Sequence, residues 1–395
     1  MKLKDSFLDI DFYLLLLYSL LPGIGKIIGF QNIMIAYVGI LFYWWIKQKN
    51  KIYISDIPFI LFLLFLILYT LLSFGLGANK SALILGVGLD LIPMSGYFLF
   101  REYDFERLCR NLILVVLVHG LIGIYLYPFF GIANFSNPKI QALIEGVAWG
   151  RMSSVSGSLG FGNLIMVGFI LCFYWKKLLA PIVFCLVIFS MQRSAWVGSA
   201  AAVLLYMYFL MKKGDAKRMS RLVFVILVLI LFVIIIVPQY IDFDFSYLIK
   251  RFSELFSGVN ENGGVRTSLW QNGIDNFKSN PLGAGIGQVG QIGTRFENTG
   301  YKVCPDGDYF RMLSEYGINF VVFVLSIIFC FMCLILFYPL NREMMCAFSV
   351  SAGSALQLIG SNITEFYFDN FIFWIFIGLN MYNAKELFHK EIVRI

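Results

Sequence analysis

The chain has 395 residues, of which 59% are hydrophobic and only 14% charged, and its formal net charge is +7. Soluble globular domains carry about a quarter charged residues. The composition therefore excludes an ordinary soluble domain and indicates a membrane protein.

Apolar runs long enough to cross a bilayer recur along the whole chain, since roughly 20 residues span about 30 Å of hydrocarbon. They predict an all-α polytopic protein with about twelve transmembrane helices. The predicted spans are about 12–25, 27–46, 54–75, 81–100, 111–130, 159–175, 178–192, 194–211, 221–238, 308–338, 343–361 and 369–384. No small-residue cleavage site follows the first run, so we expect a retained helix rather than a signal peptide.

The basic residues predict the orientation of these spans. With the N-terminus in the cytoplasm and the sides alternating, most lysines and arginines fall in short inside loops, such as the loop containing Lys212, Lys213 and Lys217. This agrees with the positive-inside rule. We therefore expect a multi-pass protein of the bacterial cytoplasmic membrane with both termini in the cytoplasm.

One polar segment, residues 239–305, interrupts the apolar sequence and is called the polar island below. It is rich in glycine, and its acids and bases balance, so it is neither a polybasic tail nor a simple linker. The chain is expected to form one integrated membrane domain. Its parts are nine spans in 1–238, the polar island outside the membrane, and three spans in 306–395.

Short amphipathic helices are expected in the polar island at Ser253–Phe256 and Leu269–Phe277, with Trp270 and Phe277 at the bilayer surface. For Trp270, interfacial anchoring and stacking on a sugar both remain open. The run Gly285–Gly290 formally fits a dinucleotide fingerprint, but no βαβ unit surrounds it. We interpret it as a flexible loop whose backbone can approach a bulky substrate.

Five arginines are placed outside the membrane or at outer helix ends, against the inside bias of the other basic residues. They are Arg151, Arg193, Arg266, Arg295 and Arg311. The planar guanidinium suits a pyrophosphate better than an ammonium does. Arg193 lies at the break between two apolar runs, where it either faces a cavity or binds helix carbonyls. Arg151 opens a stretch of small polar residues typical of a re-entrant segment.

Acidic residues gather before and within the tenth run. Asp308, Arg311 and Glu315 share one helix face, so they can form a salt-bridge ladder or take part in catalysis. Asp306 and Asp308 can also cap the helix. Asp90 is an intramembrane acid without a basic partner nearby in the sequence, and for the lone His119 a packing role is favoured.

The ordered motifs of the chain resemble the O-antigen ligase/polymerase superfamily, and most of all its Wzy-type polysaccharide polymerases. The motifs are Gln192-Arg-Ser-Ala-Trp196, Arg266-x-x-x-Trp270, Asn280-Pro-Leu-Gly283-x-Gly285 and Asp308-Tyr309-x-x-Met-Leu-x-Glu315-Tyr-Gly317, with a weaker match at Arg151. The resemblance implies a GT-C-like, metal-independent glycosyltransferase without a cofactor. Such polymerases join oligosaccharide repeat units carried on undecaprenyl pyrophosphate at the outer face of the cytoplasmic membrane, in O-antigen (lipopolysaccharide) or capsule biosynthesis.

On this resemblance, Arg193 and Arg266 stabilise the pyrophosphate leaving group. Either Asp306, Asp308 or Glu315 deprotonates the sugar hydroxyl, or no strong base is needed because pyrophosphate is already a good leaving group. Substrate-binding candidates are Arg151, Arg295, Arg311, Trp270, Tyr309, Asn280, Gly283 and Gly285. Expected partners are lipid-linked oligosaccharides, the bilayer, and a chain-length regulator and flippase of the same pathway. No metal site and no nucleic acid partner are expected.

One position separates the two activities of the superfamily. Ligases carry a histidine three residues before the tyrosine that is Tyr309 here, and this chain has Asp306 instead. The departure favours a polymerase over a ligase that transfers glycan to lipid A–core. A secondary transporter or flippase is the alternative of another class; it predicts inverted repeats, and the sequence shows no paired halves.

Overall fold

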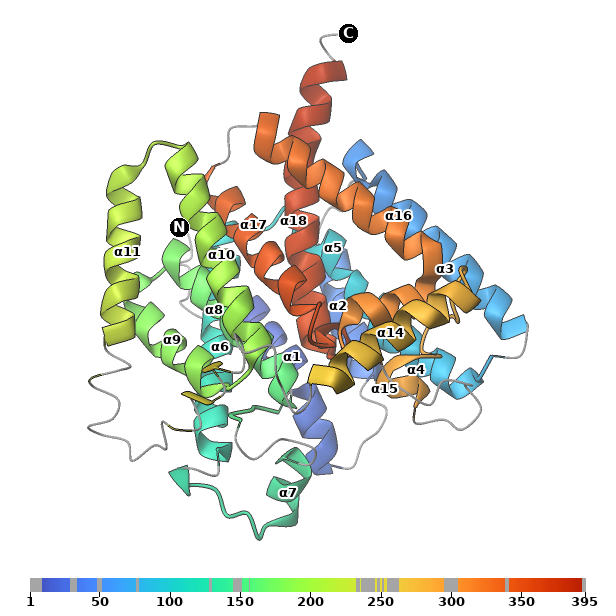
Figure 1. Cartoon of the computed structure of the whole chain (residues 1–395), viewed down its shortest axis with the longest axis horizontal. Helices are drawn as coiled ribbons and strands as arrows, with labels where there is room; N and C mark the ends of the chain where they lie inside the picture. Colours follow the sequence, from blue (N-terminus) through green and yellow to red (C-terminus); the bar gives the residue numbers. More distant parts are fainter. Residues whose placement is uncertain are drawn as a thin grey trace. The chain divides into compact units, whose positions relative to one another are not determined.

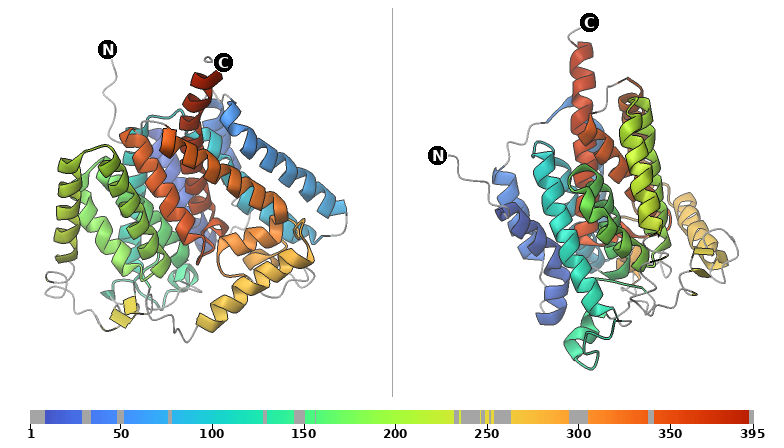
Figure 2. Two further views of the ribbon diagram at one scale, coloured as in Figure 1. Left: turned by 45° about the horizontal axis from the view of Figure 1, so that its top comes forward. Right: turned by 90° about the vertical axis from the view of Figure 1, so that its left-hand side faces the viewer.

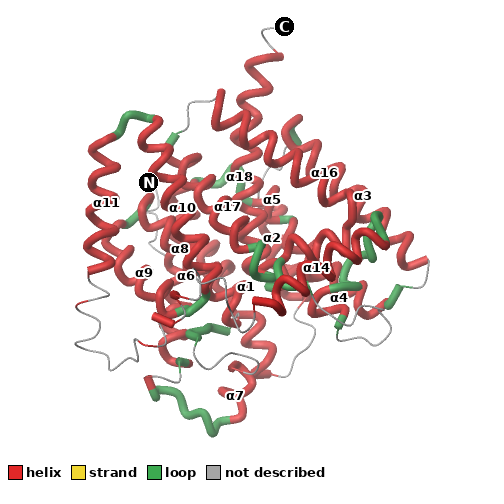
Figure 3. The backbone as a smooth tube through the Cα atoms, in the orientation of Figure 1, coloured by secondary structure: helices red, strands yellow, loops and turns green. Residues whose placement is uncertain are grey.

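The computed structural model describes residues 9–28, 34–47, 52–75, 78–127, 130–144, 151–155, 157–231, 263–294, 305–337 and 341–392, with a few isolated positions between 235 and 253. Within these ranges the ordered elements are helices, apart from one isolated bridge between Ser154 and Gly157. Figure 3 shows them in red. The prediction of an all-α chain is confirmed for this part of the protein.

Six helical segments in the described ranges are long and apolar enough to cross a membrane. They are α1 (Ile10–Ile28), η1 with α3 (Ile54–Asp56, Ile57–Gly75), α4 with α5 (Lys80–Met94, Gly96–Leu99), α6 (Phe105–Leu126), α10 (Arg193–Lys212) and most of α16 (Asp308–Phe337). Shorter apolar helices lie in α8 (Gly157–Tyr174) and in η3 with α9 (Lys177–Leu179, Ala180–Phe189). The chain thus has the helices of a multi-pass membrane protein.

The other predicted runs also coincide with helices. These are α2 (Met34–Lys47), α11 (Ala216–Leu231), α17 (Arg342–Gln357) and α18 (Tyr367–Ile392). In the part of the polar island that is described, α14 (Gly263–Ser279) and α15 (Gly290–Gly293) form. The predicted helix at Leu269–Phe277 is therefore part of a longer one. Most of the helix predicted at Ser253–Phe256 lies outside the described residues. The count of twelve spans stays a prediction.

The chain divides into two compact units. Unit 1 comprises residues 1–40, 103–259 and 348–356, and unit 2 comprises residues 41–102, 260–347 and 357–395. Both units combine segments far apart in the sequence, and the three ranges expected from hydropathy stay a prediction. That the units form one integrated membrane domain stays a prediction.

Unit 1 is built around α6, which packs against α1, α8 and α9, while α8 also packs against α10 (Figure 2). Glycines let these helices approach closely. A Cβ at Gly168 would lie 2.7 Å from the Val116 side chain, and one at Gly120 would lie 2.5 Å from Leu186. Small residues at helix contacts are typical of membrane bundles, where close packing replaces the hydrophobic effect.

Unit 2 is built around α18, which packs against α4, α5 and α16 (Figure 1). Its core contains the stacked pairs Phe59–Tyr97 and Phe62–Phe323, with Trp374 from α18 beside them. On α3, the large leucines that face away from the core are exposed; they are Leu61, Leu64, Leu68, Leu71 and Leu72. Their spacing makes one apolar helix face, as expected of a surface that contacts lipid.

Candidate functional site

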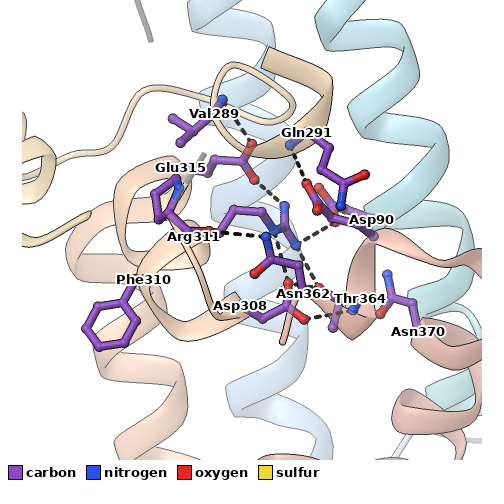
Figure 4. Close-up of polar contacts among 12 residues, drawn as sticks. Asp90, Val289, Gln291, Asp308, Phe310, Arg311, Glu315, Asn362, Thr364 and Asn370 are labelled. Carbon is purple, nitrogen blue, oxygen red and sulfur yellow. Dashed lines mark hydrogen bonds and ion pairs between the residues drawn. The ribbon is translucent and has the colours of Figure 1, made fainter. Parts of the chain in front are cut away.

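Within unit 2, the side chain of Arg311 joins three carboxylates and one hydroxyl in a buried cluster (Figure 4). The partners come from α4, from α16 and from η5 (Ile363–Glu365), the turn before α18. Arg311 is 3% exposed, and Asp90, Asp308, Glu315 and Thr364 are equally buried. We call Arg311, Asp90, Asp308, Glu315, Thr364 and Glu365 the Arg311 cluster.

Every nitrogen of the Arg311 guanidinium has a partner. Nε donates to Asp308 Oδ1 at 3.1 Å and Nη1 donates to Glu315 Oε2 at 2.5 Å. Nη2 donates to Thr364 Oγ1 at 2.7 Å and to Asp90 Oδ1 at 3.3 Å. The predicted salt-bridge ladder on one helix face is confirmed. The structure also gives Asp90 the basic partner that its sequence neighbourhood lacks. These contacts give Arg311 a structural role, and its part in substrate binding stays a prediction.

The Arg311 cluster contains more carboxyl groups than basic groups. Glu365, from η5, accepts a hydrogen bond from the Gln291 N–H at 2.7 Å, and its Oε2 is buried without a hydrogen-bond partner among the described residues. Burial raises the pKa of the Glu365 carboxyl to about 7, an effect that Arg311 opposes and that Asp308 and Asp90 reinforce. Unpaired buried charge is costly, so the Glu365 carboxyl takes up a proton as the pH falls through about 7.

Two of the three predicted base candidates are already committed to protein partners. The Asp308 carboxylate accepts from Arg311, from the Thr364 hydroxyl at 2.6 Å and from the Thr364 N–H at 2.7 Å. The Glu315 carboxylate accepts from Arg311 and from the Val289 N–H at 3.2 Å. Asp306 lies half-buried in the turn before α16, outside the cluster. Its role as general base stays a prediction.

Helix α16 breaks at Gly317, where φ is 58° and ψ is −141°. The carbonyls of Ser314 and Glu315 would each accept from a residue four positions later in an unbroken helix. Here they accept instead from the N–H groups of Ala284 and Gly285, at 2.8 and 3.0 Å. In exchange, the Ile318 N–H donates to the Pro281 carbonyl at 2.9 Å. The predicted span 308–338 coincides with this helix, and its hydropathy does not record the break.

The glycines of the turn are required by this exchange. A Cβ at Gly283, where φ is +93°, would lie 2.3 Å from the Glu315 carbonyl oxygen. One at Gly317 would lie 2.3 Å from the Pro281 carbonyl oxygen. The side chain of Asn280 donates to the Gly283 carbonyl at 2.6 Å and closes the turn. The backbone of the Asn280-Pro-Leu-Gly-x-Gly285 motif is therefore hydrogen-bonded directly to that of α16. The role of the motif in substrate binding stays a prediction.

The run that follows packs against α4. A Cβ at Gly287 would lie 2.2 Å from the Ala82 carbonyl oxygen. The Gln288 amide pairs with both backbone groups of Asn79, at 3.2 and 3.3 Å. Gly285 to Gly290 are buried throughout. The interpretation of this run as a flexible loop is wrong, because its glycines permit backbones to touch.

Aromatic residues join α14 to the start of α16, which lie side by side in Figure 1 and in the left-hand view of Figure 2. The Trp270 ring stacks on Phe310, with ring centroids 5.3 Å apart. One face of Trp270 is thus occupied, and its half-buried position leaves both anchoring and sugar stacking open. Tyr309 is half-buried and packs on Phe320.

The predicted arginines divide between the units. Arg151 and Arg193 belong to unit 1, whereas Arg266 and Arg311 belong to unit 2. Arg266 lies in the first turns of α14, and its side chain is outside the described part of the structure. Arg295 is not among the described residues.

Within unit 1, the structure brings the Arg151 segment to the break before Arg193. The Met152 N–H donates to the carbonyl of Phe189, the last residue of α9, at 3.2 Å. Arg193 is the first residue of α10 and is half-buried. A cation at a helix N-terminus is unfavourable for the helix itself, because that end already carries a partial positive charge. Together, the two charges give this end of the helix a strong positive potential. This end of α10 therefore suits an anionic group.

Some residues of these sites were missed in the sequence. Asn362, Thr364 and Glu365 lie between two apolar runs, and the only signal was the polar stretch Gly360–Glu365. In unit 1, His119 is buried, with Nδ1 2.7 Å from Ser154 Oγ and Nε2 2.9 Å from Ser19 Oγ. The packing role favoured for His119 agrees with these contacts, which fix the segment after Arg151. No cluster of His, Cys, Asp or Glu within the described ranges could hold a metal ion.

Comparison with known families assigns a segment of the chain. Residues 178–325 match the family model described as O-antigen ligase. The match covers less than half of the chain but contains Arg193, Arg266, the turn at 280–285 and the first part of α16. The comparison with curated proteins gives no match. The resemblance to the O-antigen ligase/polymerase superfamily is thereby confirmed over residues 178–325.

Proposed function

We propose that this protein is a Wzy-type polymerase, a GT-C-like glycosyltransferase that joins undecaprenyl-pyrophosphate-linked oligosaccharide repeat units at the outer face of the bacterial cytoplasmic membrane. The superfamily match supports the reaction class. The observation that carries the choice of polymerase is Asp306, half-buried on the turn before α16, at the position where ligases carry histidine.

The reaction is one glycosyl transfer. The bond between the sugar anomeric carbon and the pyrophosphate oxygen of the donor breaks, and the electron pair leaves with the pyrophosphate. The non-reducing-end hydroxyl of the next lipid-linked unit forms the new bond to that carbon. We assign its proton to the Asp306 carboxylate, which acts as general base.

Arginines stabilise the charge that develops on the leaving group. We assign this role to Arg193 and Arg266, with Arg151 as a further pyrophosphate contact. The placement of Arg193 at the N-terminus of α10 supports this assignment, because the helix dipole and the guanidinium favour the same anion. Loss of one such donor typically costs about 100- to 1000-fold in rate.

Complementation of a deletion strain tests this proposal. We expect the deletion to leave single repeat units on the acceptor, and the wild-type chain to restore the ladder of glycan lengths. Arg193→Ala, Arg266→Ala and Asp306→Ala, at matched membrane levels, are expected not to restore it. Lys278→Ala is the control, since that side chain is 66% exposed on α14.

Other results identify the alternatives. Full-length glycan that accumulates on undecaprenyl pyrophosphate in the deletion strain identifies a ligase. Lipid-linked repeat units trapped at the cytoplasmic face identify a flippase. A normal ladder with both arginine variants contradicts the proposed role of the arginines.

A further inference from the structure

The turn that carries Asp306 is held by a second segment of unit 2, the connection between α17 and α18. The Asn362 side chain donates to the Pro305 carbonyl at 3.2 Å, so it contacts the residue directly before Asp306. On the other side of Asp306, Gly307 has φ +91°, and a Cβ there would lie 2.3 Å from the Ile359 carbonyl oxygen. The residues on both sides of Asp306 thus rest on this connection.

Thr364 holds the start of α16 through both its backbone and its side chain. Its N–H donates to Asp308 Oδ2 at 2.7 Å, and its hydroxyl donates to Asp308 Oδ1 at 2.6 Å. The same hydroxyl accepts from Arg311 Nη2 at 2.7 Å. Thr364 is fully buried and Asn362 is 5% exposed, so water does not compete for these bonds.

Asn362 and Thr364 bond residues on either side of Asp306, so an effect on chemistry would act through the position of that carboxylate. General-base catalysis needs the carboxylate within hydrogen-bond reach of the attacking hydroxyl, and a displacement of about 1 Å can cost roughly 100-fold in rate.

We propose that Asn362 and Thr364 are positioning residues, which fix the Pro305–Asp308 turn so that Asp306 meets the sugar hydroxyl of the acceptor. This inference rests on the proposed function, and specifically on Asp306 as general base. It gives a role to the polar stretch Gly360–Glu365, which no motif of the family match includes.

Thr364 offers a matched pair of substitutions. Thr364→Val keeps the shape of the side chain and removes the hydroxyl, while Thr364→Ser keeps the hydroxyl and removes the methyl group. We would measure turnover and KM for purified protein in detergent with a lipid-linked repeat unit, together with the melting temperature. Thr364→Val and Asn362→Ala are expected to lower kcat by about tenfold or more with KM within about twofold, and Thr364→Ser to stay near wild type.

A double-mutant cycle separates positioning from general stability. In an Asp306→Asn background, Thr364→Val is expected to cause no further loss of kcat, because the group that it positions is already gone. If Thr364→Val lowers kcat in the Asp306→Asn background by the same factor as in wild type, the proposal is overturned. A kcat loss that Thr364→Ser shares, or one that follows the melting temperature, also overturns it.

The same measurements also test the proposed function, separately from the positioning role. If Asp306→Asn turns over as fast as wild type, the base assignment fails and the positioning proposal fails with it. If the wild-type protein instead transfers glycan to lipid A–core, the polymerase reading fails. The same Thr364 pair, measured in that transfer, then still decides the positioning role.

Discussion

At the scale of single residues, the Arg311 cluster shows how burial changes the meaning of a charged side chain. Arg311 resembles a phosphate-binding arginine in the sequence, yet all three of its nitrogens bind protein oxygens. Removing one partner of a buried ion pair leaves the other charge uncompensated, which typically costs about 3–5 kcal/mol. The same reasoning makes Asp308 and Glu315 structural anchors of the cluster.

Glu365 makes the stability of the protein depend on pH. Burial raises the pKa of its carboxyl from 4.5 to about 7 in the folded state. Its contribution is fully present below pH 4.5 and is lost as the pH rises through about 7. At about 1.4 kcal/mol per pKa unit, the loss is roughly 3 kcal/mol. We expect the melting temperature of wild type to fall between pH 5 and 8 relative to that of Glu365→Gln.

Glu365→Gln is a suitable comparison because its amide oxygen can still accept from the Gln291 N–H. Parallel melting curves for the two proteins across this pH range would show that Glu365 does not titrate there. Glu343→Gln serves as a control, since that glutamate lies in the first turn of α17, outside the cluster.

At the scale of elements, the exchange of hydrogen bonds between the turn at 280–285 and the break in α16 joins two motifs that are separate in the sequence. The freed carbonyls of Ser314 and Glu315 accept hydrogen bonds from the turn, which offsets the cost of breaking the helix there. Each motif supplies a glycine because the two backbones occupy the space of a Cβ. The two motifs thus form one structural unit, the hydrogen-bonded contact between the turn and the break in α16.

Gly283→Ala tests this close contact between the turn and α16. The new methyl group would meet the Glu315 carbonyl oxygen, and alanine would be strained at φ +93°. Both effects act together, so we expect destabilisation of about 3 kcal/mol or more, seen as a lower melting temperature in detergent.

Gly39→Ala is the matched control for this substitution. Gly39 lies within α2, and a Cβ there would meet nothing within 4 Å. Alanine should stabilise that helix by about 0.5–1 kcal/mol. Equal melting temperatures for Gly283→Ala and wild type would contradict the required close approach.

At the scale of the whole molecule, contacts inside each unit agree with the predicted alternation of sides. Gln288 and Asn79 both belong to segments predicted outside, as do Pro305 and Asn362. Tyr53 and Glu102, which share a hydrogen bond of 3.0 Å, both belong to segments predicted inside. Asp9 and Arg107 are also an inside pair. An even number of predicted spans separates the two members of each pair, as the alternation requires.

Cysteine labelling tests the absolute orientation. In a Cys304→Ser background, Lys278→Cys on α14 should react with a membrane-impermeant maleimide in intact spheroplasts. Lys217→Cys, exposed in the first turn of α11, should react only after permeabilisation, because the positive-inside rule places this end of the helix in the cytoplasm. The opposite labelling pattern would invert the predicted topology and place Asp306 on the cytoplasmic side.

The sequence alone determined the all-helical membrane character, the positions of the helices and the shared face of Asp308, Arg311 and Glu315. These features follow from local properties, namely the hydropathy of a run and the 3.6-residue period of a helix. The positive-inside bias likewise needs only the order of the loops.

Only the tertiary structure decided which charges meet and where the α16 helix breaks. Asp90 is paired with Arg311 across 221 positions, and Thr364 reaches Asp308 across 56. The periodicity of the sequence does not predict these partners. A buried charge needs a partner, and the element that supplies it is the one that packs against it in the fold. The packing of α4, α16 and the α17–α18 connection therefore determined the chemistry available to each carboxylate.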